Sequence, residues 1–435
     1  MQKLSLPLKL VAVLLCPLLY PTLTQAQSLS NTVVTNTVPS PAIATSLNLP
    51  AALAQALAAN PDVAAARREV QASEGALRQA GVMPNPELSA LVEDARQDSR
   101  STTIQINQAL ELGGKRGARV SVAERSRSAA LNELAIKSAE IRAAVTTHFF
   151  AVLIAQERQR LATVSLELAQ RASHAASRQV NLGKIPPLEA TRAGVAESGV
   201  RVELAQANSE LLIARQGLAT AMGSKLAAEQ QLQAEFHTLP ALPNMQKLTQ
   251  ALARSPLMQR AQLEVDKRVA MSALEKSRQV PDLTVSIGSK REQQTGRNQA
   301  IIGISIPLNL FDRNQGNLQE ALSRADKARD ELTATENRLH GEVLQAHQRL
   351  SLAREEAEML KKTMLPGAQQ AYELAIKGFE YGKFNFMDVL DAQRSLLQAR
   401  AQYLRSLSEA QRAAAEIEAY LGDSEFSLFT ATSSF

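Results

Sequence analysis

Two acidic residues near the C-terminal end of the chain have a spacing at which their charges would act together. Asp388 and Asp391 are three residues apart in a helical pattern, so they occupy neighbouring positions on one helix face. Acids close to a helix N-terminus often do no more than complement the helix dipole. Asp388 falls in the first turn after Phe384-Asn385, and the dipole alone is a sufficient explanation for it.

The five histidines are the next residues whose chemistry could matter. His340 and His347 are two helical turns apart, and His148 occupies the position that matches His347 in an internal repeat. A transition-metal site needs further ligands three or four residues away, and no convincing set flanks these histidines. We therefore interpret them as solvated or as hydrogen-bonding partners between helices, and we predict no metal site.

Motifs for catalysis or cofactor binding are missing from the sequence. Gly113-Gly114-Lys115-Arg116 resembles a phosphate-binding loop only weakly, because the spaced glycines and a Ser or Thr after the lysine are absent. It is better interpreted as a junction between a hairpin and a helix. No Gly-x-Ser-x-Gly, His-Glu-x-x-His or Cys-x-x-Cys motif occurs. The sequence predicts neither an enzyme nor a bound cofactor.

The elements that carry these residues occur twice. The segment Leu53–Leu88 aligns without a gap on Leu248–Leu283, and further along the chain Gly183-Lys184 falls on Gly382-Lys383. Each copy has the order helix, strand, strand, very long helix, turn, helix. Because a unit with only two strands leaves sheet edges open, its other strands must come from other subunits.

Each copy contains one exceptionally long helix. Helical spacing persists from about Lys115 to Asn181 and from about Gln315 to Glu380, with a kink expected at Pro366-Gly367. At 1.5 Å per residue such a helix spans roughly 100 Å, so it must pack in coiled-coil fashion rather than in a globular core. Gly183 and Gly382 supply the positive φ that the sharp reversal after each helix needs.

Four short segments have the alternation of β-strands, at about residues 86–94, 102–110, 281–289 and 299–309. In the second copy one face is wholly apolar and the other is small or polar, a pattern that suits a strand between lipid and water. A half-buried hairpin of a soluble protein gives the same pattern and is commoner on pattern alone. No segment after the N-terminal region has the run of 18 or more apolar residues of a membrane-spanning helix. A membrane-spanning form of this chain would therefore be a β-barrel.

The N-terminal segment resembles a secretory signal peptide. Lys3 and Lys9 precede an apolar run, Leu10–Leu19, and Thr24-Gln25-Ala26 fits a cleavage site. Cleavage removes two lysines and lowers the net charge from +5 to about +3, which is too small over this length to indicate nucleic-acid binding. The single cysteine, Cys16, lies in this segment, so the mature chain is expected to have neither a disulfide nor a thiolate metal site.

The sequence divides into six parts by composition and repeat. They are a signal peptide over residues 1–26, an extended or disordered lead over 27–46, a first repeat over 47–222, a linker over 223–244, a second repeat over 245–422, and a tail over 423–435.

These features together resemble the TolC-type outer-membrane efflux channels. The order of elements from Leu49 to Leu421 is the specific sign, and the stretch Tyr381–Gln393 is similar to the family's sequence at the second turn. Gln108–Arg116 and Ile306–Gly316 resemble most closely the heavy-metal branch. That branch comprises the outer-membrane components of cobalt–zinc–cadmium and nickel–cobalt efflux systems.

The resemblance implies a mainly helical protein with a membrane β-barrel, assembled as a homotrimer in the bacterial outer membrane. Three chains would contribute twelve strands to one barrel and twelve helices to a periplasmic coiled-coil tunnel of about 100 Å. The resemblance also implies three partners. They are a periplasmic adaptor of the membrane-fusion type, an inner-membrane, proton-driven pump of the resistance–nodulation–division type, and the lipid of the outer membrane. The channel itself would be passive.

The resemblance also assigns a role to the two turns. Contact with the adaptor would fall to Gly183, Lys184, Gly382 and Lys383, although a simple turn requirement explains each of them about as well. Two features depart from the family. The family has an aromatic residue and an arginine near the turn, and the corresponding positions here are Phe379 and Phe384, so the aromatic is kept but the charge is not. The strands contain no Trp or Tyr, so the usual interfacial aromatic belt is missing.

Within the resemblance, Asp388 and Asp391 match the acid pair that lines the periplasmic constriction of the tunnel. A trimer would place six carboxylates around one opening, and such a ring attracts cations. The first copy is not equivalent, because Glu189 matches Asp388 but Arg192 matches Asp391. The charge at the constriction is therefore expected mainly from the second turn.

The favoured prediction is a trimeric export duct for divalent heavy-metal cations. A duct for drugs or secreted proteins is an alternative of the same class. A periplasmic coiled-coil scaffold without a barrel is an alternative of a different class, and the alternating strand segments 283–287 and 302–308 argue against it.

Overall fold

The computed structural model describes residues 47–94, 96–223, 232 and 237–422. The predicted signal peptide, the lead, the tail and most of the linker lie outside the described residues. The chain divides into two units. The unit Met1–Ile43 falls entirely outside the described part, and all that follows concerns the unit Ala44–Phe435.

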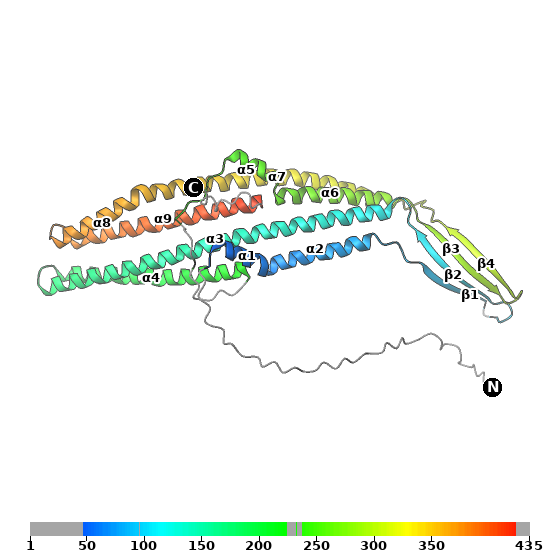
Figure 1. Cartoon of the computed structure of the whole chain (residues 1–435), viewed down its shortest axis with the longest axis horizontal. Coiled ribbons are helices and arrows are strands. Elements are labelled where there is room, and N and C mark those ends of the chain that lie inside the picture. The colour runs from blue at the N-terminus through cyan, green and yellow to red at the C-terminus, as the bar shows by residue number, and fades with distance from the viewer. Residues whose placement is uncertain (1–46, 95, 224–231, 233–236, 423–435) are drawn as a thin grey trace, which may run out of the picture. The chain divides into compact units, whose positions relative to one another are not determined.

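The described residues follow the predicted order of elements twice (Figure 1). The first repeat comprises α1 (Leu49–Ala59), α2 (Pro61–Ala80), β1 (Glu87–Glu93), β2 (Ser101–Leu110), α3 (Lys115–Asn181) and α4 (Pro187–Met222). The second comprises α5 (Met245–Leu252), α6 (Pro256–Ser277), β3 (Leu283–Glu292), β4 (Arg297–Ser305), α7 (Gln315–Met359), the π-helical turn η1 (Leu360–Met364), α8 (Leu365–Glu380) and α9 (Phe386–Leu421).

Each repeat begins with two helices, whereas the predicted order of elements has a single helix before the first strand. That prediction is wrong because a capping residue followed by proline starts a new helix in both copies. Asn60 Oδ1 accepts a hydrogen bond of 2.8 Å from the backbone N–H of Asp62 at the start of α2. Ser255 Oγ accepts one of 3.3 Å from the N–H of Met258 at the start of α6.

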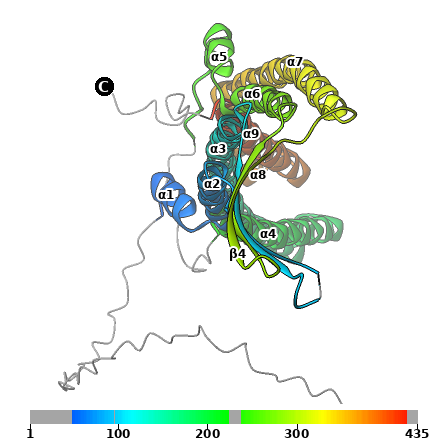
Figure 2. The same ribbon diagram turned by 90° about the vertical axis from the view of Figure 1, so that its right-hand side faces the viewer.

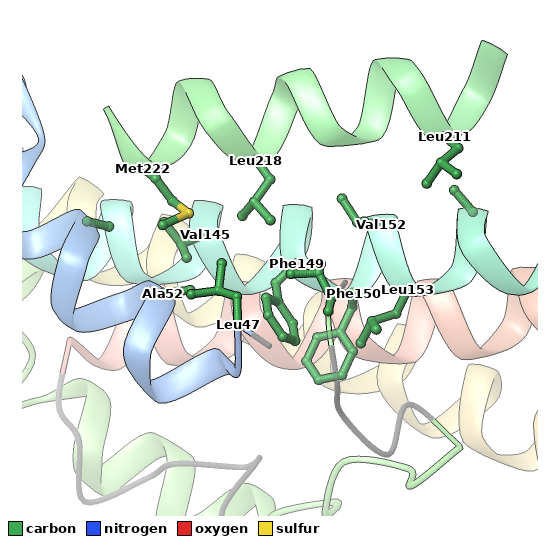
Figure 3. Packing of buried hydrophobic residues seen from close by; sticks show 13 residues of the cluster. Leu47, Ala52, Val145, Phe149, Phe150, Val152, Leu153, Leu211, Leu218 and Met222 are labelled. Carbon is green, nitrogen blue, oxygen red and sulfur yellow. The ribbon is translucent and has the colours of Figure 1, made fainter. Parts of the chain in front are cut away.

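The long helices pack side by side with their return helices. In the first repeat α3 lies against α1 and α4 and buries an apolar cluster between them (Figure 3). The second repeat has an equivalent cluster between α5, α7 and α9. The first cluster includes Leu47, Ala52, Val145, Phe149, Val152, Leu218 and Met222, and the second includes Leu248, Leu252, Val343, Leu350, Ala414 and Ile417.

Helix α3 contains an 18-residue stretch that could cross a membrane by its length and composition. The stretch includes polar residues, so the sequence still has no uninterrupted run of 18 apolar residues after the N-terminal region. Of the residues in this stretch, 44% are buried inside the protein. The core helix of a helical body can have the same length and composition as a helix that crosses a membrane. The packing of α3 against α1 and α4 places it in such a body.

The second long helix is interrupted where the first is continuous. The kink expected at Pro366-Gly367 takes the form of the π-helical turn η1, directly before α8. Proline lacks a backbone N–H and its ring crowds the preceding turn, so the helix gains an extra residue there instead of continuing its regular hydrogen bonds.

The four strands form one antiparallel sheet in the order β1-β2-β3-β4. The pairing of β2 with β3 joins the two repeats, while β1 and β4 lie at the two edges. Viewed from the sheet end, the sheet is curved (Figure 2). The two edge strands therefore present backbone groups that could pair with another chain.

The two faces of the sheet differ in chemistry. One row in register across all four strands consists of Leu88, Ile106, Ile287 and Ile302, and these side chains are between 53% and 81% exposed. The neighbouring row on the other face includes Asn107 opposite Ser286, and Ser286 opposite Gly303. The alternation predicted from the sequence is therefore an exposed apolar face backed by a polar face.

The fourth strand ends earlier than its predicted limit at residue 309. It runs from Arg297 to Ser305 because Pro307 has no N–H to donate to a sheet. Beyond it the backbone N–H of Leu310 donates to the carbonyl oxygen of Leu308 at 2.9 Å in a tight turn. The segment after β4 is thus a connection and not part of the sheet.

Candidate functional site at the helical tips

The first helical tip joins α3 to α4 through a closely defined turn. The N–H of Gly183 donates to the carbonyl oxygen of Val180, and the N–H of Lys184 donates to that of Gln179, both at 2.9 Å. This pair of bonds is the Schellman arrangement, which satisfies carbonyls left free at a helix C-terminus. Gly183 has a φ of +68°, the left-handed conformation that this turn requires.

The second tip, between α8 and α9, repeats this geometry. The N–H of Gly382 donates to Phe379 O at 3.0 Å, and the N–H of Lys383 donates to Gly378 O at 2.7 Å. Gly382 has a φ of +69°. A Cβ added at Gly183 or Gly382 would meet nothing within 4 Å. The backbone conformation, and not packing within the chain, therefore accounts for both glycines.

The lysines that follow the two glycines are exposed. Within the part of the chain that the structure describes, neither Lys184 nor Lys383 takes part in an ion pair. The four residues predicted to contact an adaptor therefore form two open, positively charged turns.

The helices that leave the two tips begin differently. In the second tip Asn385 Oδ1 accepts from the N–H of Asp388 at 3.0 Å, and Asp388 Oδ2 accepts from the N–H of Asn385 at 2.9 Å. This reciprocal capping box stabilises the start of α9. In the first tip Pro186 precedes α4 and provides no side-chain cap. A structural role at the helix start, one of the two explanations considered for Asp388, is thus present.

The acids of the two tips also differ in their partners. Glu189 Oε1 lies 3.0 Å from Arg192 Nη1, so the first tip neutralises its own acid. Asp388 and Asp391 are exposed, and among the described residues neither carboxylate has an ion-pair partner. The start of α9 therefore carries two carboxylates within one turn of helix that form no ion pair with a described residue.

The two tips contact each other through apolar side chains. Ala176 of α3, Ala193 of α4 and Leu390 of α9 form one buried cluster, with Ile185 and Phe379 packed against it. The fold thus brings the two predicted turns to the same end of the helical body (Figure 1).

Two features of the tips were not found from the sequence. The ring of Phe384 lies against Gly378 so closely that a Cβ at this glycine would overlap it. Asn385 forms the capping box with Asp388. The second feature had a sequence signal, a capping residue three positions before an acid, whereas the first depends on how the turn folds back.

Across the described ranges, no three His, Cys, Asp or Glu side chains gather as a possible metal-binding group. The arrangement at the tips is therefore one of exposed charges on rigid turns, not of a ligand cage. Such charges act on a passing ion through their field.

The described residues thus form a duplicated helical body, a sheet with one exposed apolar face and edges at β1 and β4, and charged helical tips. The chain belongs to the outer membrane efflux protein family, whose sequence model matches residues 52–224 and 248–423. The family predicted from the sequence is confirmed. The protein is accordingly located in the outer membrane, with its helices in the periplasm.

Two known proteins are similar to this chain in sequence, and one solved structure is similar to it in fold. The chain is 46% identical over 422 residues to the cobalt-zinc-cadmium resistance protein CzcC of Cupriavidus metallidurans, covering 97% of this chain and 100% of that protein. It is 28% identical to the nickel-cobalt-cadmium resistance protein NccC of Alcaligenes xylosoxydans xylosoxydans, covering 64% of this chain and 65% of that protein. Its fold is similar to that of CusC, with a TM-score of 0.71 and 20% identity over 86% of this chain and 91% of that one.

Proposed function

We propose that this protein is the outer-membrane channel of a tripartite efflux system that exports divalent heavy-metal cations. The observation that carries the proposal is the 46% identity to a cobalt-zinc-cadmium resistance protein over the whole length of that protein. The weaker likeness to a nickel-cobalt-cadmium resistance protein points to the same class of cargo.

The working form would be a homotrimer. The sheet has free edges at β1 and β4, and its curvature (Figure 2) suits a segment of a closed cylinder. Three copies would pair β1 of one chain with β4 of the next and leave no edge open, as a membrane requires. The exposed row of Leu88, Ile106, Ile287 and Ile302 would then face lipid.

The helical tips would carry two separate roles in the trimer. Asp388 and Asp391 would line the periplasmic constriction and concentrate cations there, because they lack ion-pair partners among the described residues. The two turns, Gly183-Lys184 and Gly382-Lys383, would dock a periplasmic adaptor. Their openness supports this, because a Cβ at either glycine would meet no atom of the described residues within 4 Å. The adaptor would connect the channel to an inner-membrane, proton-driven pump of the resistance–nodulation–division type.

The proposed cargo can be tested by growth of a deletion strain in zinc, cobalt, cadmium and nickel salts. We expect the strain to become sensitive to one or more of these metals, and resistance to return with the wild-type gene. Sensitivity to hydrophobic drugs in the same plates provides the comparison. Loss of drug resistance without any loss of metal resistance would contradict the metal cargo and favour the alternative duct.

The proposed barrel can be tested separately by solubility. Because the apolar sheet face is exposed, the protein is expected to need detergent and to elute as a trimer. A monodisperse monomer in detergent-free buffer would contradict the channel and favour a periplasmic scaffold.

A further inference from the structure

Two arginines lie beyond the apolar rows at the end of the sheet farthest from the helices. Arg291 of β3 is in register with Thr102 of β2, and it alternates onto the same face as Ile287. Arg100 directly precedes β2 and is two positions before Thr102, so continuing the strand alternation by one residue would place it on that face. The backbone bond from the N–H of Gln293 to Arg100 O, at 3.0 Å, keeps this segment beside β3.

The charges on the two faces of this sheet end are arranged differently. On the polar face, Lys290 Nζ lies 2.8 Å from Glu93 Oε2, and Ser101 Oγ donates to the same carboxylate oxygen at 2.9 Å. On the apolar face, within the part of the chain described, neither Arg100 nor Arg291 has an acidic partner. Among the described residues, two guanidinium groups are therefore left without counter-charges at the end of the apolar face, where the register partners of Arg291 are the polar residues Thr102 and Asn298.

The apolar rows between these arginines and the helices have the height of a membrane core. From Thr102 to Leu110 the strand rises about 27 Å, which is roughly 20 Å of membrane thickness at the usual strand tilt. Leu112 and Phe311 are exposed beyond it, Phe311 at 92%, and they extend the apolar surface toward the typical height of about 25 Å. The arginines thus fall where a lipid headgroup would begin.

A second copy of the chain would not cover these arginines. Arg291 belongs to the central strand β3, and Arg100 directly precedes the central strand β2, whereas a neighbouring copy would pair at β1 or β4. Their face would meet lipid in the trimer, and their end of the sheet is the one opposite the periplasmic helices (Figure 1). In the trimer these arginines would therefore face the lipids of the outer leaflet.

We propose that Arg100 and Arg291 form a binding site for the phosphate groups of a phosphorylated glycolipid in the outer leaflet of the outer membrane. The inference rests on the proposed function, because it requires the apolar face to lie in lipid. Guanidinium groups bind phosphate oxygens through paired, charge-assisted hydrogen bonds. At the boundary of the apolar band they fix the height of the barrel in the membrane, a task usually shared by interfacial aromatics, of which β1 to β4 have no Trp or Tyr.

The site can be tested with full-length protein in detergent and bisphosphorylated lipid A as the probe, by native mass spectrometry or a fluorescence titration. In Arg100→Gln/Arg291→Gln we expect the dissociation constant to rise about 25-fold, because each basic side chain near an anionic lipid surface contributes about fivefold. Arg297→Gln is the matched control, since Arg297 lies at the same sheet end on the polar face opposite Glu292. It should change the constant less than about twofold.

One further double variant and one competitor make the result decisive. Arg100→Lys/Arg291→Lys keeps both charges and should retain most of the binding, which a merely unfolded sheet would not. Inorganic phosphate at the concentration of the lipid should not displace it, and displacement would overturn the assignment to a lipid. Equal lipid A binding by the wild type and the double glutamine variant, with both proteins trimeric, would also overturn it.

Failure of the proposed function would be visible separately. A wild-type protein that is monomeric without detergent would show that the face does not lie in lipid. A channel that binds lipid A through these arginines but protects against no metal would leave the lipid site standing and overturn the cargo.

Discussion

The first helical tip pairs its acid with an arginine, whereas among the described residues the acids of the second tip have no ion-pair partner. In the first, Glu189 pairs with Arg192 at 3.0 Å. In the second, the equivalent positions are Asp388, engaged through one oxygen in a capping box, and Asp391, which is exposed. The glycine turns before them are the same in φ and in hydrogen bonds. Duplication has therefore preserved the backbone geometry that reverses the chain, while the charges have diverged.

The same contrast occurs in the middle of the helical body. In the first repeat, a Cβ at Gly217 would lie 2.8 Å from His148 Nδ1, so the glycine makes room for the imidazole. In the second repeat the matching position is Glu416, which pairs with Arg349 at 2.8 Å and accepts a hydrogen bond from Tyr420 at 3.1 Å. Burial, together with Glu416, raises the pKa of Tyr420 to about 12. At this position the first repeat has the imidazole of His148 against a glycine. The second repeat has an ion pair and a hydrogen bond centred on Glu416.

The sheet is the region where the two repeats are equivalent, and it offers the largest expected effect. Ile106 of the first repeat and Ile287 of the second are in register. We expect Ile106→Lys and Ile287→Lys to cost alike, about 2–4 kcal/mol in each chain, because a lysine on the lipid face near mid-membrane must be desolvated. The measurement is the fraction of protein recovered as trimer from the outer membrane.

The neighbouring residue of β3 supplies the control for this prediction. Ser286 points to the polar face, so Ser286→Lys should leave the trimer at nearly the wild-type level. If Ser286→Lys were as damaging as Ile287→Lys, the apolar face would not be the one in lipid.

The sequence predicted the parts of the fold that depend on periodicity and turn chemistry. The long helices, the alternating strands and the two glycine turns follow from local patterns and are present in the structure. Breaks set by a single residue were missed or displaced, such as the new helix that starts after Asn60 and the π-helical turn before Pro366. Helical spacing continues through both places, so the pattern alone does not reveal them.

For the candidate site, the sequence predicted where its residues lie on the helices but not which partners they have. The spacing of Asp388 and Asp391 placed them on one face of a helix, but their lack of ion-pair partners within the described residues depends on tertiary packing. The pairing of β2 with β3 joins residues about 180 positions apart in the chain, a contact that no local pattern specifies. The strand order that places β1 and β4 at the two edges therefore became visible only in the folded sheet.

The tips should respond alike to a change in their glycines. Gly183→Asp and Gly382→Asp each place a side chain in open space but at positive φ, which costs about 1–2 kcal/mol. We expect both variants to remain trimeric in the outer membrane but to lose metal resistance, because the added side chain projects into the proposed adaptor contact. Trimer yield and growth in metal salts measure the two outcomes.

A glycine away from the tips separates docking from backbone strain. Gly114 has a φ of +75° and equally open surroundings at the start of α3, so Gly114→Asp bears the same backbone cost without reaching the adaptor. It should keep resistance. Full resistance in both tip variants would remove the docking assignment, and loss in all three would reduce it to a folding effect.

The charges of the tips should respond differently from each other. Asp388→Asn/Asp391→Asn keeps an oxygen for the capping box while removing both charges, so the trimer should form. In planar bilayers we expect block by multivalent cations to weaken at least about fivefold, the effect of about 1 kcal/mol from a screened unit charge. Glu189→Gln/Arg192→Gln removes an internally neutral pair and should leave block unchanged. Equal behaviour of the two double variants would mean that the acids of α9 serve only the helix start.

The smallest expected effect concerns His148 of the first repeat. Burial lowers the pKa of His148 below the usual value of 6.5. As the pH falls below about 6.5, the unfolded chain takes up a proton before the folded chain does, so stability is lost until the pH passes the folded pKa. His148→Gln should therefore lose less thermal stability than the wild type between pH 7.5 and 5.5. In the second repeat His347 Nε2 lies 3.0 Å from Pro243 O, and His347→Leu should instead lose about 1 kcal/mol at pH 7.5 with this hydrogen bond. The measurement is the fall in melting temperature between pH 7.5 and 5.5. If it is no larger in the wild type than in His148→Gln, the space beside Gly217 does not keep this imidazole neutral.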